Sequence, residues 1–186
     1  MKRLFDLLVA FTASAILILP ILVIMVLVRR SSSGSALYWS ARVGRHNKIF
    51  QMPKFRSMTE GAPTVATHLL VNPDSYITPI GSFLRRTSMD ELPQLWSILN
   101  GDMSLVGPRP ALYNQYDLIS LRTSEGVDKL VPGLTGWAQV NGRDEVPIPI
   151  KVALDAEYLR CQSLSFDIYI LWLTVRKVLH MDDVSH

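Results

Sequence analysis

Two carboxylates, Asp90 and Glu91, stand side by side in the stretch TSMDELPQLW at residues 87–96. Ser88, three residues before Glu91, has the spacing of a capping box, which would make the acids ordinary features of a helix start. Acids at a helix start are also kept ionised by the helix dipole, so they can bind a metal ion or attack phosphorus. Pro93 fits only the first turn of a helix, and we therefore expect the helix to begin near Asp90. These residues alone leave both interpretations open.

Basic side chains that suit a phosphate group occur on both sides of this acid pair. Arg85 precedes the acids by one or two helical turns, and Arg109 stands between two prolines in the sequence GPRP. A guanidinium on a rigid turn loses little entropy when it binds a phosphate through two hydrogen bonds. A surface salt bridge is the simpler role for Arg109, and from this residue alone that role is favoured.

A third group of polar residues lies in the loop GWAQVNGR, which offers Gln139, Asn141 and Arg143. Amide and guanidinium side chains on a glycine-hinged loop suit a base, a ribose or a pyrophosphate. The signal is weak when taken alone. None of the three groups defines a function by itself.

The composition limits the classes of protein that need to be considered. The chain has 186 residues, 48% of them hydrophobic, and a formal net charge of +3, which suits one membrane-associated domain with anionic partners. No basic helix or zinc-finger spacing supports nucleic-acid binding. The four histidines lack metal-ligand spacing, and the single cysteine, Cys161, excludes an intrachain disulfide.

An uncharged apolar segment at residues 7–28 is long enough to cross a bilayer. Charges follow it where a signal-peptide cleavage site would be, which argues against a cleaved signal. Pro20 in its middle bends a helix, and basic residues flank both ends, so a straight span and a re-entrant helix with both ends on one side are equally compatible. We expect Asp6 to pair with Lys2 or Arg3 at head-group level.

The remaining chain predicts a mainly α domain with a small β-hairpin. The hairpin is expected at 42–58, a loop at 59–79, and a proline-braced turn at 105–112. Helices are expected at 89–99, 111–130, 149–160 and 163–180, the last of them at the membrane interface or in the core. On the helix at 149–160, Asp155 and Tyr158 are one turn apart. The domains are thus a membrane helix at 1–30 and one compact domain at 31–186, which would be the catalytic domain if the acid pair performs chemistry.

Taken together, several motifs resemble the bacterial sugar transferases that are monotopic phosphoglycosyl transferases. The motifs are KRLFDL, RVG…KFRSM, LRRTSMDELPQLWSILNGDMSLVGPRP, VPGLTGWAQVNGR and the D…EY of LDAEYL. They run along nearly the whole chain, and the central run is too long to match by accident. One departure is Leu19-Pro20, where the family's usual helix break is a Ser-Pro pair. The chain resembles the short form of the family, without an additional multi-span N-terminal domain.

The resemblance implies transfer of a phospho-sugar from a UDP-sugar to polyprenol (undecaprenyl) phosphate at the cytoplasmic face of the bacterial inner membrane. Asp90 would be the nucleophile of a ping-pong route that releases UMP, and Glu91 together with Asp90 would hold Mg²⁺. Arg85 and Arg109 would bind phosphate. Gln139, Asn141 and Arg143 would contact the nucleotide-sugar. The resemblance also favours a re-entrant helix broken at Pro20.

Two rival functions stay open at this stage. A non-catalytic membrane-surface adaptor on the same scaffold would use the acid pair only as a helix cap. A direct transfer in a ternary complex would use Asp90 as a general base. The sequence selects neither the sugar, nor the glycan pathway, nor the oligomeric state.

Overall fold

The computed structural model describes residues 1–186 except 33, 64–72, 143–145 and 181–186. It is mainly helical with a small antiparallel hairpin, as predicted. The elements, in chain order, are α1 (Lys2–Ser31), β1 (Leu37–Val43), β2 (Ile49–Phe55), α2 (Pro79–Arg86), α3 (Gln94–Asn100), β3 (Ser104–Val106), α4 (Tyr116–Ser124), β4 (Gly133–Thr135), α5 (Trp137–Val140), α6 (Ile148–Cys161) and α7 (Leu164–His180).

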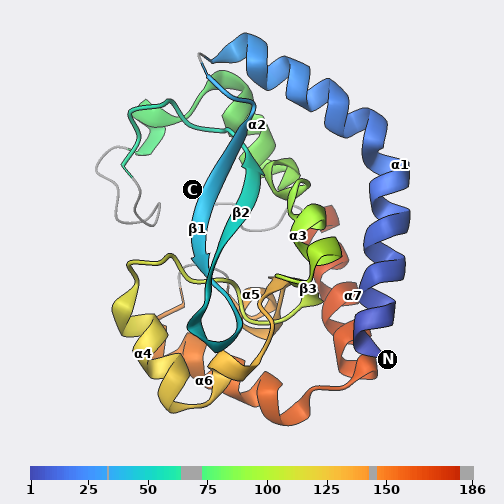
Figure 1. Cartoon of the computed structure of the whole chain (residues 1–186), viewed down its shortest axis with the longest axis vertical. Coiled ribbons are helices and arrows are strands. Elements are labelled where there is room, and N and C mark those ends of the chain that lie inside the picture. The colour runs from blue at the N-terminus through green and yellow to red at the C-terminus, as the bar shows by residue number, and fades with distance from the viewer. Residues whose placement is uncertain (33, 64–72, 143–145, 181–186) are drawn as a thin grey trace.

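The predicted hairpin is confirmed, although it lies closer to the N-terminus than expected. Strands β1 and β2 pair antiparallel from Leu37 opposite Phe55 to Val43 opposite Ile49. His46 and Asn47 form the turn with φ values of 55° and 58°, a left-handed conformation that Asn and His tolerate better than most residues. Figure 1 shows this hairpin as a long ribbon in front of the helices.

A second sheet, not foreseen from the sequence, joins the two proline- and glycine-rich segments. Strands β3 and β4 pair in parallel, with Ser104 opposite Gly133 and Val106 opposite Thr135. Their backbones approach so closely that a Cβ on Gly133 would overlap the backbone nitrogen of Gly107. The glycines of LVGPRP and VPGLTG therefore serve this close approach, and each strand has only three residues.

Helix α1 lies along one side of the domain and changes direction in its C-terminal half (Figure 1). Its first half packs on the main core through Ala10, which is fully buried. Its second half packs through Ile24 and Val28 on a separate cluster with Phe55 of β2 and Leu84 of α2. Within the described chain, α1 is the one helix long and apolar enough to cross a membrane, and only 11% of its most apolar window is buried.

The polar residues at the start of α1 attach the helix to the domain. Asp6 is 3% exposed and accepts hydrogen bonds from Ser104 Oγ at 2.8 Å and from the backbone nitrogen of Leu105 at 3.2 Å. The predicted pairing of Asp6 with Lys2 or Arg3 is therefore wrong, because Asp6 faces β3. Lys2 instead contacts Asp167 of α7 at 2.7 Å.

Arg3 completes this attachment by capping helix α3. Its guanidinium donates to the backbone carbonyls of Ile98 at 2.6 Å and Leu99 at 2.9 Å. These carbonyls belong to the last turn of α3, where the Ile98 carbonyl also accepts from Gly101 N at 3.1 Å. The charges before the apolar segment thus have intramolecular partners.

Replacing Asp6 by Ala should destabilise the protein. The change leaves the Ser104 hydroxyl and the Leu105 amide buried without an acceptor, which we expect to cost about 1–3 kcal/mol. Thermal unfolding in detergent or nanodiscs measures the difference. Asp102→Ala is the matched control because Asp102 is exposed; an equal loss in both variants would contradict the role of Asp6.

The predicted bounds of the C-terminal helices agree with the structure more closely than those of the central helices. The helix predicted at 149–160 is confirmed as α6, and that at 163–180 as α7. Helix α7 packs in the core through Ile170, which is fully buried, while Trp172 is 53% exposed. Its position at the membrane interface stays a prediction. The helix expected at 111–130 is wrong in extent, because α4 ends at Ser124 and Gly126 takes a left-handed φ of 72° before a short 3₁₀ turn.

Candidate active site

The acid pair lies on a short 3₁₀ turn, Met89–Glu91, between α2 and α3. The helix that we expected to begin near Asp90 begins at Gln94, with Pro93 as its N-cap at φ −61°. Ser88 has a left-handed φ of 56°, and its side chain makes no capping hydrogen bond. The capping-box interpretation is therefore wrong. The predicted helix end is confirmed, because Gly101 closes α3 with φ 98°.

Two cations converge on one oxygen of Glu91. Lys54 Nζ donates to Glu91 Oε1 at 2.7 Å, and Arg109 Nη2 donates to the same oxygen at 2.9 Å. Lys54 comes from β2 and Arg109 from the turn after β3, so the hairpin and the second sheet both position the site. The side chains of Lys54 and Glu91 are only 16% and 18% exposed.

Asp90 is held more loosely than Glu91. Among the described residues the nearest cation is Lys54, whose Nζ lies 3.9 Å from Asp90 Oδ2, beyond hydrogen-bond distance. The side chain of Asp90 is 13% exposed. Adjacent acids thus have different surroundings, which is a common arrangement where two carboxylates perform different tasks.

The pKa values of the two acids move in opposite directions. Burial raises the pKa of Asp90, and the negative charge of Glu91 adds to this, while Lys54, Arg109 and Arg85 act against it. Burial would also raise the pKa of Glu91, but Arg109 and Lys54 outweigh it and hold that pKa well below its usual range. Glu91 is therefore a fixed anion, and Asp90 is the more basic carboxylate.

Arg85 belongs to the same cluster. It lies in the last turn of α2, a helix that begins with Pro79 and is capped by Thr78 Oγ1, which accepts from Gly81 N at 3.0 Å. Its positive charge is close enough to lower the pKa of Asp90. The structure therefore brings Arg85 and Arg109 to the acid pair, as the sequence predicted.

Lys54 is the residue that sequence reasoning missed. It stands in the motif KFRSM, which the resemblance included without a role for its lysine. The hairpin brings it to a carboxylate 37 residues away. With Arg85 and Arg109, it gives the site three positive groups against the two negative charges of Asp90 and Glu91, which favours an anionic ligand.

The third predicted group does not join this cluster in the described part of the chain. Asn141 Nδ2 donates to the carbonyl of Trp137 at 2.8 Å, and Gln139 Nε2 donates to the carbonyl of Leu134 at 3.2 Å. Gln139 Oε1 is buried and has no hydrogen-bond partner. Both amides therefore serve the local backbone around α5. Arg143 lies outside the described residues, and the role of all three in binding a nucleotide-sugar stays a prediction.

The acid pair suits Mg²⁺ only in combination with a ligand. No group of three or more His, Cys, Asp or Glu residues is close enough to hold a metal within the described ranges. Mg²⁺ usually takes one or two protein carboxylates and completes its shell with substrate phosphates and water. Lys54 and Arg109 both contact Oε1 of Glu91, so Oε2 remains as a possible metal ligand. One or two carboxylates of this kind fit Mg²⁺ when a diphosphate supplies further oxygens.

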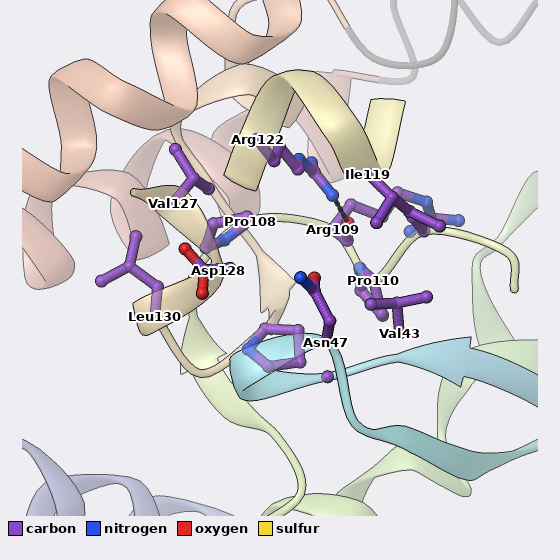
Figure 2. A pocket seen from close by; sticks show the side chains of 13 residues that line it. Val43, Asn47, Pro108, Arg109, Pro110, Ile119, Arg122, Val127, Asp128 and Leu130 are labelled. Carbon is purple, nitrogen blue, oxygen red and sulfur yellow. Dashed lines mark hydrogen bonds between the residues drawn. The ribbon is translucent and has the colours of Figure 1, made fainter. Parts of the chain in front are cut away.

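A small cavity lies behind the turn that carries Arg109 (Figure 2). Its volume is about 30 Å³, and Asn47, Arg122 and Asp128 are among the residues that line it, whereas Asp90 and Glu91 are not. A cavity of this size holds a single water molecule, far less than the several hundred Å³ of an ordinary ligand pocket. The cavity is therefore no nucleotide site.

The fold and the site define a domain attached to an apolar helix, with an acid pair surrounded by cations that suit phosphate. The sequence model of the bacterial sugar transferases matches residues 1–181, and the chain belongs to this family. It is 39% identical to an uncharacterised sugar transferase of Bacillus subtilis, over 100% of this chain and 90% of that protein.

Other relatives carry names that specify a reaction. The chain is 38% identical to the undecaprenyl-phosphate galactose phosphotransferase of Salmonella typhimurium, over 98% of this chain and 41% of that protein. It is 39% identical to the undecaprenyl-phosphate glucose phosphotransferase of Komagataeibacter xylinus, over 95% of this chain and 35% of that protein. The chain thus spans about two fifths or less of the length of these two relatives.

Proposed function

We propose that this protein transfers a sugar phosphate from a UDP-sugar to undecaprenyl phosphate or a similar polyprenol phosphate. The observation that carries the proposal is the acid pair with its opposite pKa directions, inside a cluster of three cations. Relatives named as undecaprenyl-phosphate galactose and glucose phosphotransferases support this substrate class. The product would be the first lipid-linked intermediate of a bacterial glycoconjugate.

The proposed reaction has two displacements at one phosphorus atom. A carboxylate oxygen of Asp90 attacks the β-phosphorus of the UDP-sugar, and the bond between this phosphorus and the bridging oxygen breaks, so that UMP leaves. An oxygen of polyprenol phosphate then attacks the phospho-sugar on Asp90, and the carboxylate is released. The raised pKa of Asp90 makes it the more basic carboxylate, and its loose contact with Lys54 at 3.9 Å leaves it less neutralised.

The neighbouring residues bind and orient the diphosphate. Lys54, Arg85 and Arg109 supply positive charge close to the acids, which offsets the repulsion between an anionic nucleophile and an anionic substrate. Glu91, with help from Asp90, would hold Mg²⁺, whose chemistry is to neutralise charge that develops on the leaving phosphate. The low pKa of Glu91 keeps it ionised for this task.

The attachment of α1 supports a re-entrant membrane helix. A straight helix of 30 residues would separate its ends by about 45 Å, and a bilayer would then lie between them. Near its start, however, Asp6 is buried against β3, and near its end Val28 is fully buried against the same domain. We infer that both ends lie on the cytoplasmic face of the bacterial inner membrane, with the bend at Pro20.

Cysteine labelling tests this topology. After Cys161, which is exposed, is replaced by Ser, single cysteines at Leu4 and Ser31 should react from the same side of right-side-out and inverted vesicles. Reaction of the two positions from opposite sides would mean a spanning helix. Reaction of a cysteine at Tyr116, which is 74% exposed on the domain, identifies the cytoplasmic side in the same preparation.

A UMP-release assay tests the function directly. The full chain in nanodiscs, with Mg²⁺ and undecaprenyl phosphate, is offered a panel of UDP-linked hexoses and N-acetylhexosamines. We expect at least one of them to give UMP and a lipid-linked sugar diphosphate in equal amounts. Absence of UMP with every donor would refute the proposal, and UDP in place of UMP would indicate a glycosyl transfer of another kind.

A further inference from the structure

The turn at residues 107–111, called here the Arg109 turn, is held at each successive carbonyl from Pro108 to Ala111. Pro108 and Pro110 lack an N–H, so the turn has few donors of its own. The carbonyl of Pro108 accepts from Gly133 N at 2.9 Å and that of Ala111 from Val43 N at 2.9 Å. Donors from β4 and β1 therefore hold the two ends of the carbonyl series.

The two middle carbonyls are held by guanidinium groups. Arg122 Nη1 donates to the carbonyl of Arg109 at 2.7 Å, and Arg42 Nη1 donates to the carbonyl of Pro110 at 3.1 Å. Figure 2 shows the Arg122 side chain reaching from α4 to the backbone of Arg109. The carbonyl of the very residue that contacts Glu91 is thus held by the shorter of these two bonds.

Arg122 is itself fixed by a buried acid. Its Nε and Nη2 donate to Asp155 Oδ2 at 2.9 and 2.6 Å, and the side chain of Asp155 is 1% exposed. The ion pair with Asp155 of α6 therefore orients the remaining guanidinium nitrogen, Nη1, towards the Arg109 carbonyl. A lysine has no such planar fork and could not satisfy both partners in this geometry.

Tyr158, one turn after Asp155 on α6, holds the strand that leads into the turn. Its hydroxyl lies 3.2 Å from the carbonyl of Val106 and 2.6 Å from Asp167 Oδ1, and its side chain is buried. Asp155 and Tyr158 of the D…EY motif are therefore buried in the interior, whereas Glu157 accepts a hydrogen bond from Trp137 Nε1 at 2.9 Å. Tyr158 directly, and Asp155 through Arg122, contact the backbone on either side of Gly107.

We propose that Arg122, paired with Asp155, is a positioning residue that sets the place of the Arg109 guanidinium at the acid pair. This role rests on the proposed function, because Arg109 is there the residue that binds the diphosphate. The path has three contacts: Asp155 to Arg122, Arg122 to the Arg109 carbonyl, and Arg109 Nη2 to Glu91 Oε1. Displacement of the turn by about 1 Å would be enough to reduce the rate about 100-fold.

The test uses Arg122→Met with Asp155→Leu, which removes both charges of the pair at once. Replacement of a buried ion pair by apolar groups of similar volume is often neutral or stabilising, so this double variant should keep its thermal midpoint. It leaves the Arg109 carbonyl without its guanidinium donor. We expect kcat/KM for the UDP-sugar to fall about 10- to 100-fold. Unchanged kcat/KM would overturn the proposal.

A cycle with Arg109→Lys separates positioning from general damage to the fold. If Arg122 acts through Arg109, the Met/Leu pair should lower kcat/KM by less than about 3-fold in the Arg109→Lys background. An equal loss in both backgrounds would overturn the proposal. Arg45→Met is the matched control, because Arg45 Nε donates to the carbonyl of Lys129 at 2.8 Å, in the 3₁₀ turn Val127–Lys129 and not in the Arg109 turn, and it should leave kcat/KM unchanged.

Hydrogen exchange tests the positioning role without any reaction. The amides of Gly107, Arg109 and Ala111 should exchange faster in the Met/Leu variant than in the wild type, and Arg45→Met should not change them. Unchanged exchange would overturn the proposal even in an active enzyme. Lack of UMP release by the wild type would refute the proposed function alone, and the exchange experiment would still decide whether Arg122 holds the turn.

Discussion

Asp90→Asn should abolish UMP release. The amide has nearly the shape of the carboxylate, so the 3₁₀ turn at Met89–Glu91 should persist, but an amide cannot form the acyl phosphate that links a phospho-sugar to Asp90. Loss of a nucleophile typically lowers kcat by about 10³-fold or more. The assay measures UMP release in nanodiscs with a UDP-sugar that the wild type uses.

Intact-mass measurement provides the second readout of this prediction. Wild-type protein quenched with UDP-sugar in the absence of lipid acceptor should gain the mass of one phospho-sugar, and Asp90→Asn should not. Asp102→Asn is the matched control, since Asp102 is an exposed acid that follows α3, and it should behave like the wild type. Wild-type UMP release by Asp90→Asn would show that Asp90 is not the nucleophile and would leave it a structural role. If the wild type released UMP but gained no phospho-sugar mass, direct transfer in a ternary complex would be favoured.

Glu91→Gln should lower the rate and raise the Mg²⁺ concentration needed for half-maximal activity. Gln can still accept hydrogen bonds from Lys54 and Arg109 at the same oxygen, but it has no negative charge. The loss removes a charged ligand for the ion and leaves the two cations without their common counter-ion. We expect kcat to fall about 10²-fold or more.

A Mg²⁺ titration of the variant checks this prediction. Glu60→Gln is the control, because Glu60 also pairs with a guanidinium, that of Arg56 at 3.2 Å, but is 57% exposed. A surface ion pair of this kind contributes little, so Glu60→Gln should follow the wild-type Mg²⁺ curve. If Glu91→Gln followed that curve as well, the metal role assigned to Glu91 would be wrong.

The parts of this fold that sequence reasoning found are those with local signals. The uncharged apolar run of the N-terminal segment, the hairpin, and the helices at 149–160 and 163–180 each depend on a few neighbouring residues. The prediction of a capping box was wrong at residues 88–93, because the same amino-acid sequence can form either a capping box or a turn with a left-handed Ser88. The conformation there depends on how β2, α2 and α3 meet around the acids.

Charged residues gave the largest difference between expectation and structure. Lys2, Arg3 and Asp6 were read as head-group charges, yet they bind α7, α3 and β3. A charge pattern next to an apolar segment is the same whether the partner is a lipid or a distant carbonyl. Only the packing of α1 on the domain distinguishes these cases.

The sequence by itself determined the family resemblance, the apolar helix with Pro20, the hairpin, and the acid pair with Arg85 and Arg109 as candidates. The tertiary structure decided that Lys54 joins Glu91, and that Asp155 reaches the Arg109 turn through Arg122. Lys54 and Glu91 are 37 positions apart in the sequence, and Arg122 and Asp155 are 33 apart. Arg122 and Arg109 are 13 apart and belong to different elements. The geometry of these contacts is set by burial and by the backbone pairing of β1 with β2 and of β3 with β4, which bring together residues that are distant in the sequence.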